Sequence, residues 1–396
     1  MKFCTYTLVD NSPDPISGVQ LTPYQRFQHV VEQARWAEDL GFDGYGVGER
    51  HAQRFLSSSP PVVLAYIAAS TSKIRLLTTV TVLSLLDPVR VAEDYATLDQ
   101  LSGGRLDIII GKGNDPDQNE LFGYDLDGQW DRNREKYELL RRLLRQEKVS
   151  WEGKYRPALS EATTRPRPFQ TPSIPIWHGS ASSTESTELA AKWGEPLFSA
   201  NGFHPLEKYA GLIRHYRERW EAYGHDPADA VVGAGFNGLY VKKTSQQAIE
   251  GYRPIFDAFM DSPGAKHNQL PFKTLEEFLE GGSVLVGSPE QVIDKFGRYQ
   301  AAFGHELSGV SLEVPGLPED ENRASVETFV TEVIPVLRRT YPSRVWGASL
   351  VGVEAGGPLL LDPAVLPDPE SDQPSGDEEP NDAVADVVQV QAGDHR

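Results

Sequence analysis

Two glycines and a lysine follow a short apolar run near the first third of the chain. Leu106–Ile110 is almost continuously apolar, which predicts a strand buried on both faces of a parallel sheet. Gly111 and Gly113 come next, and glycine lets the backbone approach a ligand closely. Lys112 stands between them and offers a positive charge to an anion. We therefore expect the floor of a cofactor site at this strand end.

A second run of small residues has the composition of a phosphate site. Residues 179–184, Gly-Ser-Ala-Ser-Ser-Thr, follow another predicted strand and lead into a helix. Free backbone N–H groups at a helix N-terminus, together with the helix dipole, bind phosphate. Alternatively, the serines only cap the helix. The residues alone leave both interpretations open.

His51 is the histidine best placed for proton transfer. It follows a predicted strand and has Glu49 and Arg50 before it. A free imidazole titrates near neutrality and suits proton transfer or the stabilisation of an anion. The structural alternative is a loop histidine whose ring is held by Glu49. His178 is a weaker candidate, and its neighbour Trp177 is more typical of packing than of contact with a cofactor ring.

Other common chemistries lack their residue patterns. The nine histidines include no H-E-x-x-H, and Cys4 is the single cysteine, so the sequence predicts no metal site and no internal disulfide. No G-x-S-x-G elbow supports Ser-His-Asp hydrolysis. The formal charge of −19 argues against nucleic acid as a partner.

The elements that would position these residues alternate between strands and helices. Equal numbers of the two favour a (β/α)8 TIM barrel with insertions over a doubly wound open sheet, which would need a G-x-G-x-x-G. In such barrels the chemistry lies at the carboxyl ends of the strands. The predicted strands are Lys2–Leu8, Asp43–Val47, Ile74–Val80, Leu106–Ile110, Ile174–His178, Leu197–Ala200, Val231–Val241 and Gly309–Val314. Capping patterns predict helix starts at Thr22, at Ser182 or Ser183 with Glu185, at Thr244 and at Ser288.

Three further segments lie outside this alternation. Residues 149–175 predict a small hairpin and an extended strap, and Asp261–Gly282 has no clear period and predicts a mobile loop. Residues 362–396 hold ten acids and one arginine with many prolines, which predicts a disordered acidic tail. We therefore expect a barrel over residues 1–345 and a disordered C-terminal tail over 346–396.

The location of the protein follows from two absent signals. No run is long and apolar enough for a transmembrane span, and the first residues lack the apolar segment of a secretory signal. We expect a cytoplasmic protein that does not associate with membranes.

Four segments of the chain resemble the bacterial luciferase-like family of flavin-dependent monooxygenases, in the family's order. They are AEDLGFDGYGVGERH, LLTTVTVLSLLDPVRVAEDYATLDQLSGGRLDIIIGKG, PSIPIWHGSASSTES and VGSPEQVIDKF. The resemblance implies a barrel that binds reduced FMN, supplied by a separate flavin reductase, and uses O2 to oxidise a small organic substrate. It also implies a homodimer and a lid over Asp261–Gly282. By position it assigns flavin contacts to Val80, Lys112, Gly113, Asn114, Trp177, Gly179, Ser180 and Ser183.

The chain departs from luciferase after the second strand. Luciferase has two histidines behind the glutamate, whereas this chain has Arg50 and then His51. Arginine cannot act as a base, which argues against the light-emitting oxidation of aldehydes. The resemblance leaves His51 as the catalytic proton donor or acceptor. It leaves Arg50 to hold an anionic substrate or the peroxide.

Two other functions fit the same fold. One is a deazaflavin-dependent dehydrogenase, which moves hydride without O2, and the other is a non-catalytic flavin-binding protein. The polar groups His51 and Asn114 near the expected ring site weigh against the latter. The substrate pocket would be lined by strand-end and loop residues, namely Phe55, Phe198, Asn201 and Asn237. This mixture of apolar and amide groups does not identify a substrate.

Overall fold

The computed structural model describes residues 1–51, 54–113, 115–202, 204–262, 265 and 270–347. Asn114 and residues 348–396 of the expected acidic tail lie outside the described residues, so their predicted roles stay predictions.

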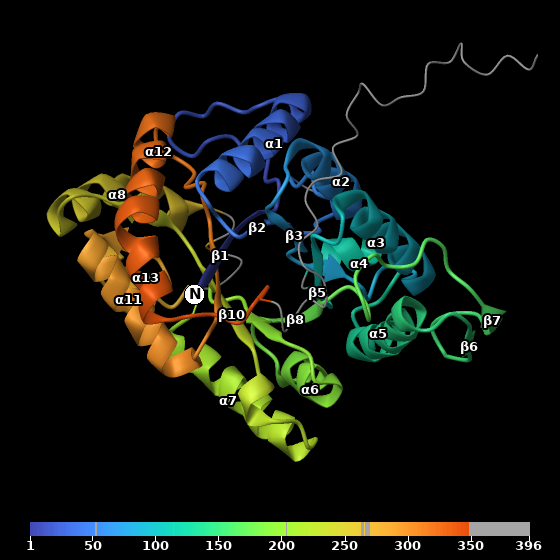
Figure 1. Ribbon diagram of the computed structural model, residues 1–396. Helices are drawn as coiled ribbons and strands as arrows, with labels where there is room; N and C mark the ends of the chain where they lie inside the picture. The colour runs from blue at the N-terminus through green and yellow to red at the C-terminus, as the bar shows by residue number, and fades with distance from the viewer. Residues whose placement is uncertain (52–53, 114, 203, 263–264, 266–269, 348–396) are drawn as a thin grey trace, which may run out of the picture. The chain divides into compact units, whose positions relative to one another are not determined.

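Eight parallel strands close into a barrel (Figure 1). Neighbouring strands follow the order β3-β2-β1-β13-β10-β9-β8-β5, and pairing of β3 with β5 closes the ring. The predicted (β/α)8 TIM barrel is confirmed. The barrel strands are β1 (Lys2–Thr7), β2 (Gly44–Val47), β3 (Arg75–Thr78), β5 (Leu106–Gly111), β8 (Ile176–Ser180), β9 (Leu197–Ser199), β10 (Val232–Phe236) and β13 (Leu307–Val310).

Helices follow the strands and cover the outside of the barrel (Figure 1). The longer helices of the ring bury an apolar stripe, as α5 does with four leucines of its inner face. The helices are α1 (Pro23–Asp39), α2 (Pro60–Ser70), α3 (Pro88–Ser102), α4 (Pro116–Leu121), α5 (Gln129–Arg145), α6 (Thr184–Trp193), α7 (Leu206–Ala222), α8 (Ser245–Asp261), α10 (Leu275–Gly281), α11 (Pro289–Phe303), α12 (Glu319–Thr328) and α13 (Ile334–Thr340). The described residues also form a short 3-10 helix, η1 (Pro227–Asp229), and a π-helical segment, η2 (Phe329–Val333).

Side-chain caps begin several helices as predicted. Thr22 caps α1 and Ser288 caps α11, each in a complete capping box. Thr244 accepts the Gln247 N–H at 3.3 Å at the start of α8. The predicted cap of α6 is wrong, because Ser183 is its N-cap residue and makes no side-chain cap hydrogen bond.

Three predicted strands differ clearly from the observed ones. The predicted strand Gly309–Val314 is wrong in its second half, because β13 begins at Leu307 and ends at Val310. The third strand ends at Thr78, and after a break β4 (Thr81–Val82) continues beside β5. The predicted strand Val231–Val241 is wrong as a single strand, because Gly238 takes a φ of 53° and turns the chain. Beyond that turn, β11 (Leu239–Val241) pairs with β12 (Leu285–Gly287) in a separate sheet.

The two predicted insertions have different outcomes. The hairpin is confirmed, since β6 (Val149–Trp151) and β7 (Leu159–Ala162) pair antiparallel. The predicted loop over Asp261–Gly282 is wrong in part, because it contains α10. Thr274 caps that helix, and its Leu275 and Phe278 are buried in a small apolar cluster with residues of α8. Burial of these two apolar side chains stabilises a helix in a segment whose polar composition predicts a loop.

The interior of the barrel is filled by apolar side chains from different strands, among them Leu77, Ile109, Trp177 and Phe198. At the amino-terminal end, Asp107 pairs with Arg75 and accepts the Trp346 indole N–H at 2.8 Å. The chain after α13 therefore returns to close the floor of the barrel.

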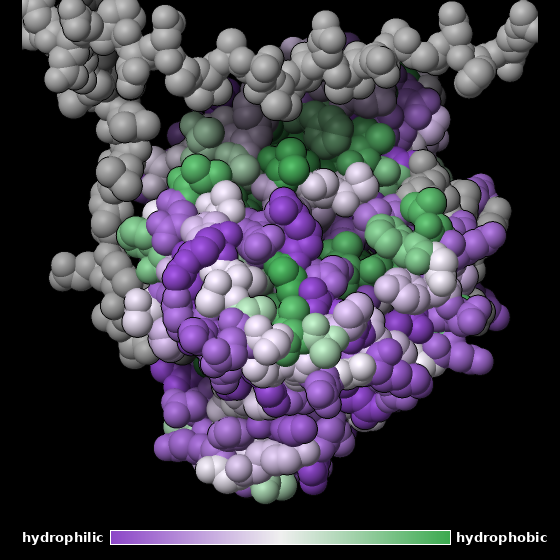
Figure 2. Space-filling model, turned by 90° about the vertical axis from the view of Figure 1, so that its right-hand side faces the viewer, coloured by the Kyte–Doolittle hydropathy of each residue, from purple (hydrophilic) through white to green (hydrophobic). Residues whose placement is uncertain are grey.

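The outer surface is largely polar. Hydrophilic residues cover most of the lower part of the face in Figure 2, and apolar residues gather above them. Every helix of the described residues is too short or too polar to cross a membrane.

Candidate active site

The candidate residues lie at the carboxyl ends of four neighbouring strands. His51 follows β2, Val80 follows β3, Lys112 follows β5 and Gly179 belongs to β8, and these strands are consecutive around the barrel. Because parallel strands end on one face, the fold brings these residues to one rim. The backbone N–H of Glu49 donates to the Val80 carbonyl at 2.9 Å and ties the first two strand ends together.

Val80 forms an apolar wall on this rim. A Cβ on Gly111 would lie 2.8 Å from one Val80 methyl carbon, and a Cβ on Gly179 would lie 2.9 Å from the other. Neither position tolerates a side chain without displacing Val80, because interiors are already close-packed. Val80 itself stays partly exposed, so its outer surface is open to a flat ring.

Thr79 is a polar residue beside this wall that the sequence analysis did not single out. Its Oγ1 is buried and has no hydrogen-bond partner among the described residues. A Cβ on Gly46 would come within 2.6 Å of its methyl carbon, which places the side chain inside the barrel. An unsatisfied buried hydroxyl is costly, so a ligand atom would be its natural partner. The only signal in the sequence was a hydroxyl residue within an apolar strand.

Lys112 lies between β5 and the start of α5. Its Nζ donates to the Gly113 carbonyl at 3.0 Å and to Gln129 Oε1 at 3.2 Å. Burial lowers the pKa of Lys112, and the carboxylate of Glu185 in the first turn of α6 opposes that effect. Gly113 takes a φ of 77°, a conformation that favours glycine. The ammonium is therefore within electrostatic reach of the α6 N-terminus.

The N-terminus of α6 presents backbone donors without a side-chain acceptor. Ser183 makes no cap hydrogen bond, and Ser180 Oγ donates to the Ser183 carbonyl at a long 3.4 Å. Glu185, expected to complete a cap, is exposed instead. A helix N-terminus with free N–H groups is suited to phosphate.

Glu49 holds the His51 ring and the chain after β3 at the same time. Glu49 Oε1 lies 2.7 Å from His51 Nε2, and Glu49 Oε2 accepts the Val82 N–H at 2.8 Å. Both residues are buried, and the Phe122 ring packs edge-on against His51 with centroids 4.7 Å apart. The contact matches the structural interpretation of His51, and it also orients an imidazole as carboxylate–histidine pairs do in enzymes.

Arg50 stands at the outer edge of the rim. Its Nη1 lies 3.8 Å from Asp115 Oδ2, and its guanidinium lies 5.4 Å from the centre of the Phe55 ring. Burial lowers the pKa of Arg50, which Asp115 opposes, and the group stays charged. A partly exposed cation at this position can meet an anionic ligand.

Trp177 and His178 take part in packing on opposite faces of β8. The Trp177 indole N–H donates to Asp107 Oδ2 at 3.0 Å within the barrel floor. His178 Nε2 lies 2.9 Å from Glu195 Oε2, and burial lowers the pKa of His178 to about 3. Trp177 is therefore placed beneath the rim as support, and His178 faces α5.

The four residues expected around the substrate fall into two groups. Phe198 lies inside the barrel and Phe55 lies under Arg50. Asn237 is engaged locally, since its Nδ2 donates to the Gly202 carbonyl at 2.8 Å. Asn201 Oδ1 accepts Ser199 Oγ–H at 2.6 Å, but its buried Nδ2 has no hydrogen-bond partner among the described residues. The aromatic pair therefore fits an apolar pocket, and the Asn201 amide keeps an unused donor.

Tyr6 of β1 also reaches this space, although the sequence did not mark it. Its ring lies against Gly309, and its hydroxyl donates to the Phe236 carbonyl at 3.4 Å, longer than a strong O–H···O bond. Tyr6 is partly exposed inside the barrel. Its oxygen can still accept a hydrogen bond near the expected substrate.

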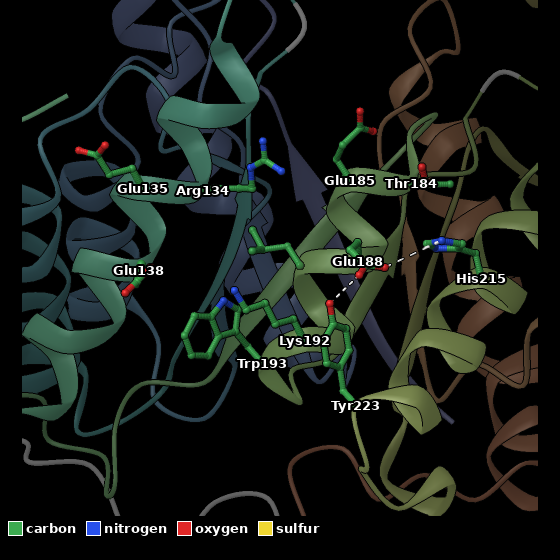
Figure 3. A pocket seen from close by; sticks show the side chains of 11 residues that line it. Arg134, Glu135, Glu138, Thr184, Glu185, Glu188, Lys192, Trp193, His215 and Tyr223 are labelled. Carbon is green, nitrogen blue, oxygen red and sulfur yellow. Dashed lines mark hydrogen bonds and ion pairs between the residues drawn. The ribbon is translucent and has the colours of Figure 1, made fainter. Parts of the chain in front are cut away.

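A cavity of about 570 Å³ opens along α6, between α5 and α7 (Figure 3). It begins at Thr184 and Glu185, beside the candidate phosphate site, and extends to Trp193. Four glutamates and only two strongly basic residues line it, so the groove is acidic. The charged lining residues are Arg134, Glu135, Glu138, Glu185, Glu188 and Lys192.

Comparison with known proteins identifies the family of the chain. The family described as luciferase-like monooxygenase matches residues 1–306. One relative is the oxygenase component of the flavin-dependent trigonelline monooxygenase of Acinetobacter baylyi. It is 25% identical over 374 residues, covering 87% of this chain and 98% of the relative.

Two solved structures share the barrel. The FMN complex of the oxygenating constituent of 3,6-diketocamphane monooxygenase from Pseudomonas putida has a TM-score of 0.69 and 20% identity, and covers 85% of this chain and 98% of its own. An F420-dependent secondary alcohol dehydrogenase has a TM-score of 0.65 and 19% identity, and covers 85% and 99%. At these identities the likeness concerns the fold. The family match spans most of the barrel, and the chain therefore belongs to the luciferase-like family of flavin-dependent monooxygenases.

Proposed function

We propose that the protein is a monooxygenase that binds reduced FMN and uses O2 to oxidise a small organic substrate. One observation carries the cofactor assignment: an uncapped helix N-terminus, a lysine and an apolar wall lie along one rim of the barrel. These are the groups that the phosphate and the ring of FMN require.

Each predicted contact then has a role toward FMN. Lys112, Ser180 and Ser183 would hold the phosphate, while Val80, Gly113 and Gly179 would border the ring, with Trp177 beneath. Asn114 remains assigned by resemblance alone. The orphaned Thr79 hydroxyl would gain a partner at the polar edge of the ring. When bound, reduced FMN supplies the electrons that activate O2.

The chain itself supplies proton transfer and charge. His51 would donate or accept a proton at the rim, oriented by Glu49. Arg50 would hold an anionic group of the substrate or of reduced oxygen. A separate flavin reductase would supply the reduced cofactor, as the name of the trigonelline relative, an oxygenase component, supports.

The deazaflavin alternative is disfavoured by the charge of the groove. Coenzyme F420 carries carboxylates beyond its phosphate, and a tail that left the α6 N-terminus along this groove would meet Glu185 first. Like charges repel in such a setting. FMN ends at its phosphate and places no further anionic group along this groove.

We also propose a homodimer formed through α2. This helix has no charged residue, yet Val62 and Tyr66 on one face are 68% and 54% exposed. An apolar helix is normally buried, so a second copy of the chain is the occupant that the family resemblance implies.

Anaerobic calorimetry with reduced FMN and reduced F420 tests the cofactor. We expect wild-type protein to bind FMN at least tenfold more tightly than F420. Ser180→Asp should weaken FMN binding more than tenfold, because it places a carboxylate against the phosphate. Glu207→Gln in the first turn of α7 is the matched control and should change nothing. Unchanged affinity in Ser180→Asp would put the phosphate elsewhere, and tighter F420 binding would favour the dehydrogenase.

A further inference from the structure

We infer that Glu49 sets the tautomer of His51, so that Nε2 carries the proton toward Glu49 and Nδ1 is the nitrogen that exchanges a proton with the ligand. The inference rests on the proposed function in making His51 catalytic. It assigns Glu49 as a positioning residue.

The first step is the contact between Glu49 and the ring. Glu49 Oε1 lies 2.7 Å from His51 Nε2. An ionised carboxylate has no proton to donate and only accepts. In the neutral imidazole one nitrogen donates and the other accepts, so the donor must be Nε2. Nδ1 then keeps its lone pair.

The second step is the contact that prevents the carboxylate from turning. Glu49 Oε2 accepts the Val82 backbone N–H at 2.8 Å, and a backbone N–H can only donate. The Glu49 side chain is 1% exposed, so water does not compete for either oxygen. Glu49 Oε2 is thus occupied by the Val82 N–H, and Oε1 is the oxygen that faces His51.

The third step concerns the other face of the ring. Among the described residues no hydrogen bond reaches His51 Nδ1. With the proton on Nε2, Nδ1 is the ring nitrogen left with a lone pair to accept a proton from a ligand. Arg50 precedes His51 in the chain, and its Nη1 lies 3.8 Å from Asp115 Oδ2.

A single substitution reverses this arrangement. In Glu49→Gln the amide oxygen must face the Val82 N–H, since two donors cannot pair. The amide NH2 then faces His51 and can only donate, so Nε2 must become the acceptor and the proton moves to Nδ1. The same logic explains why the asparagine substitution in serine-protease triads traps the wrong tautomer, a known case in other enzymes.

The experiment is a two-bond ¹H–¹⁵N correlation spectrum of the full chain with ¹⁵N-histidine, without flavin, at pH 8. His51→Gln identifies the His51 signals by their disappearance. We expect a protonated Nε2 in the wild type and a protonated Nδ1 in Glu49→Gln. Glu38→Gln, another carboxylate that accepts backbone N–H groups, is the matched control and should leave His51 unchanged.

The outcomes separate this inference from the cofactor proposal. A protonated Nδ1, or a doubly protonated ring, in the wild type overturns the inference whether or not FMN binds. If Glu49→Gln fails to fold, the wild-type spectrum alone decides. With FMN bound, Glu49→Gln should keep its affinity within about twofold and lose turnover by about a hundredfold to ten-thousandfold, the usual cost of lost acid–base catalysis. Turnover within about twofold of wild type would also overturn the assignment.

Discussion

Val80 fits this barrel only because its neighbouring strands carry glycine. Both Gly111 and Gly179 leave a space that a Val80 methyl occupies. An alanine at either position would displace the Val80 side chain from the space it fills, because the added Cβ would lie within 3 Å of a Val80 methyl carbon. The surface proposed to face the flavin is therefore shaped jointly by three strands.

His51 contributes both to stability and to the proposed proton transfer, and two substitutions can separate these roles. His51→Ala should lower turnover about a hundredfold to ten-thousandfold. It should also lower the free energy of unfolding by about 1–3 kcal/mol, because a buried Glu49 oxygen loses its partner. His51→Gln restores a donor toward Glu49 and should recover stability but not turnover. Steady-state kinetics and urea denaturation check this, and recovery of turnover in the glutamine variant would make His51 structural.

The sequence could locate part of this rim and not the rest. His51, Lys112 and Ser180 were predictable because alternating strands and helices place strand ends on one face. Thr79 and Tyr6 were not, since their exposure depends on which strands pair across the barrel. The contact of Glu49 with Val82 joins residues 33 positions apart and has no local signature.

Among the elements, α10 is held by a buried lysine. Lys295 Nζ donates to the carbonyls of Gly282 at 3.0 Å and Val284 at 2.9 Å, and to that of Leu279. An ammonium here meets the carbonyls at the end of the helix, where the dipole favours a cation.

Lys295→Met should therefore loosen the segment that contains α10. The variant leaves buried carbonyls without a donor, and we expect a loss of about 1–3 kcal/mol in the free energy of unfolding. Hydrogen exchange should rise most in residues 275–285. Lys192→Met, a lysine on the outer groove, is the control. If Lys295→Met raised hydrogen exchange equally throughout the chain, Lys295 would not stabilise this segment specifically.

The local pattern of apolar and capping residues predicted most helices and strands, but it did not predict where some of them end. Eight strands and the capping boxes at Thr22 and Ser288 follow from period and cap residues. The end of β10 depends on one glycine whose φ the sequence does not reveal. α10 forms because Leu275 and Phe278 find apolar partners on α8, a tertiary effect that overrides composition.

At the scale of the whole molecule, the proposed dimer depends on α2. Tyr66→Glu should place a charge on the apolar face and give a monomer by light scattering coupled to size-exclusion chromatography. Tyr24→Glu alters a residue that is 73% exposed on α1 and serves as the control. A wild-type protein that is already monomeric would refute the dimer.

The end of the chain should divide into a dispensable and a required part. A protein ending at Asp362 lacks most of the acidic tail and should keep flavin binding and activity. A protein ending at Tyr341 also lacks Val345, which is 1% exposed, and should lose about 2 kcal/mol or more of unfolding free energy. Thermal denaturation and FMN titration distinguish the two, and equal stability would show that the floor contributes nothing.

The floor contact also bears on the order in which the protein is made. Asp107 is synthesised 239 positions before Trp346, and its carboxylate accepts a hydrogen bond from the Trp346 indole N–H. Until that tryptophan emerges from the ribosome, the barrel can close its ring but not its base, and the Asp107 carboxylate is paired with Arg75 and the Trp177 indole N–H but lacks its third partner. The contact of Trp346 with Asp107 therefore forms after the strands have paired. Protease resistance of ribosome-bound chains of increasing length should rise again once residue 346 has emerged.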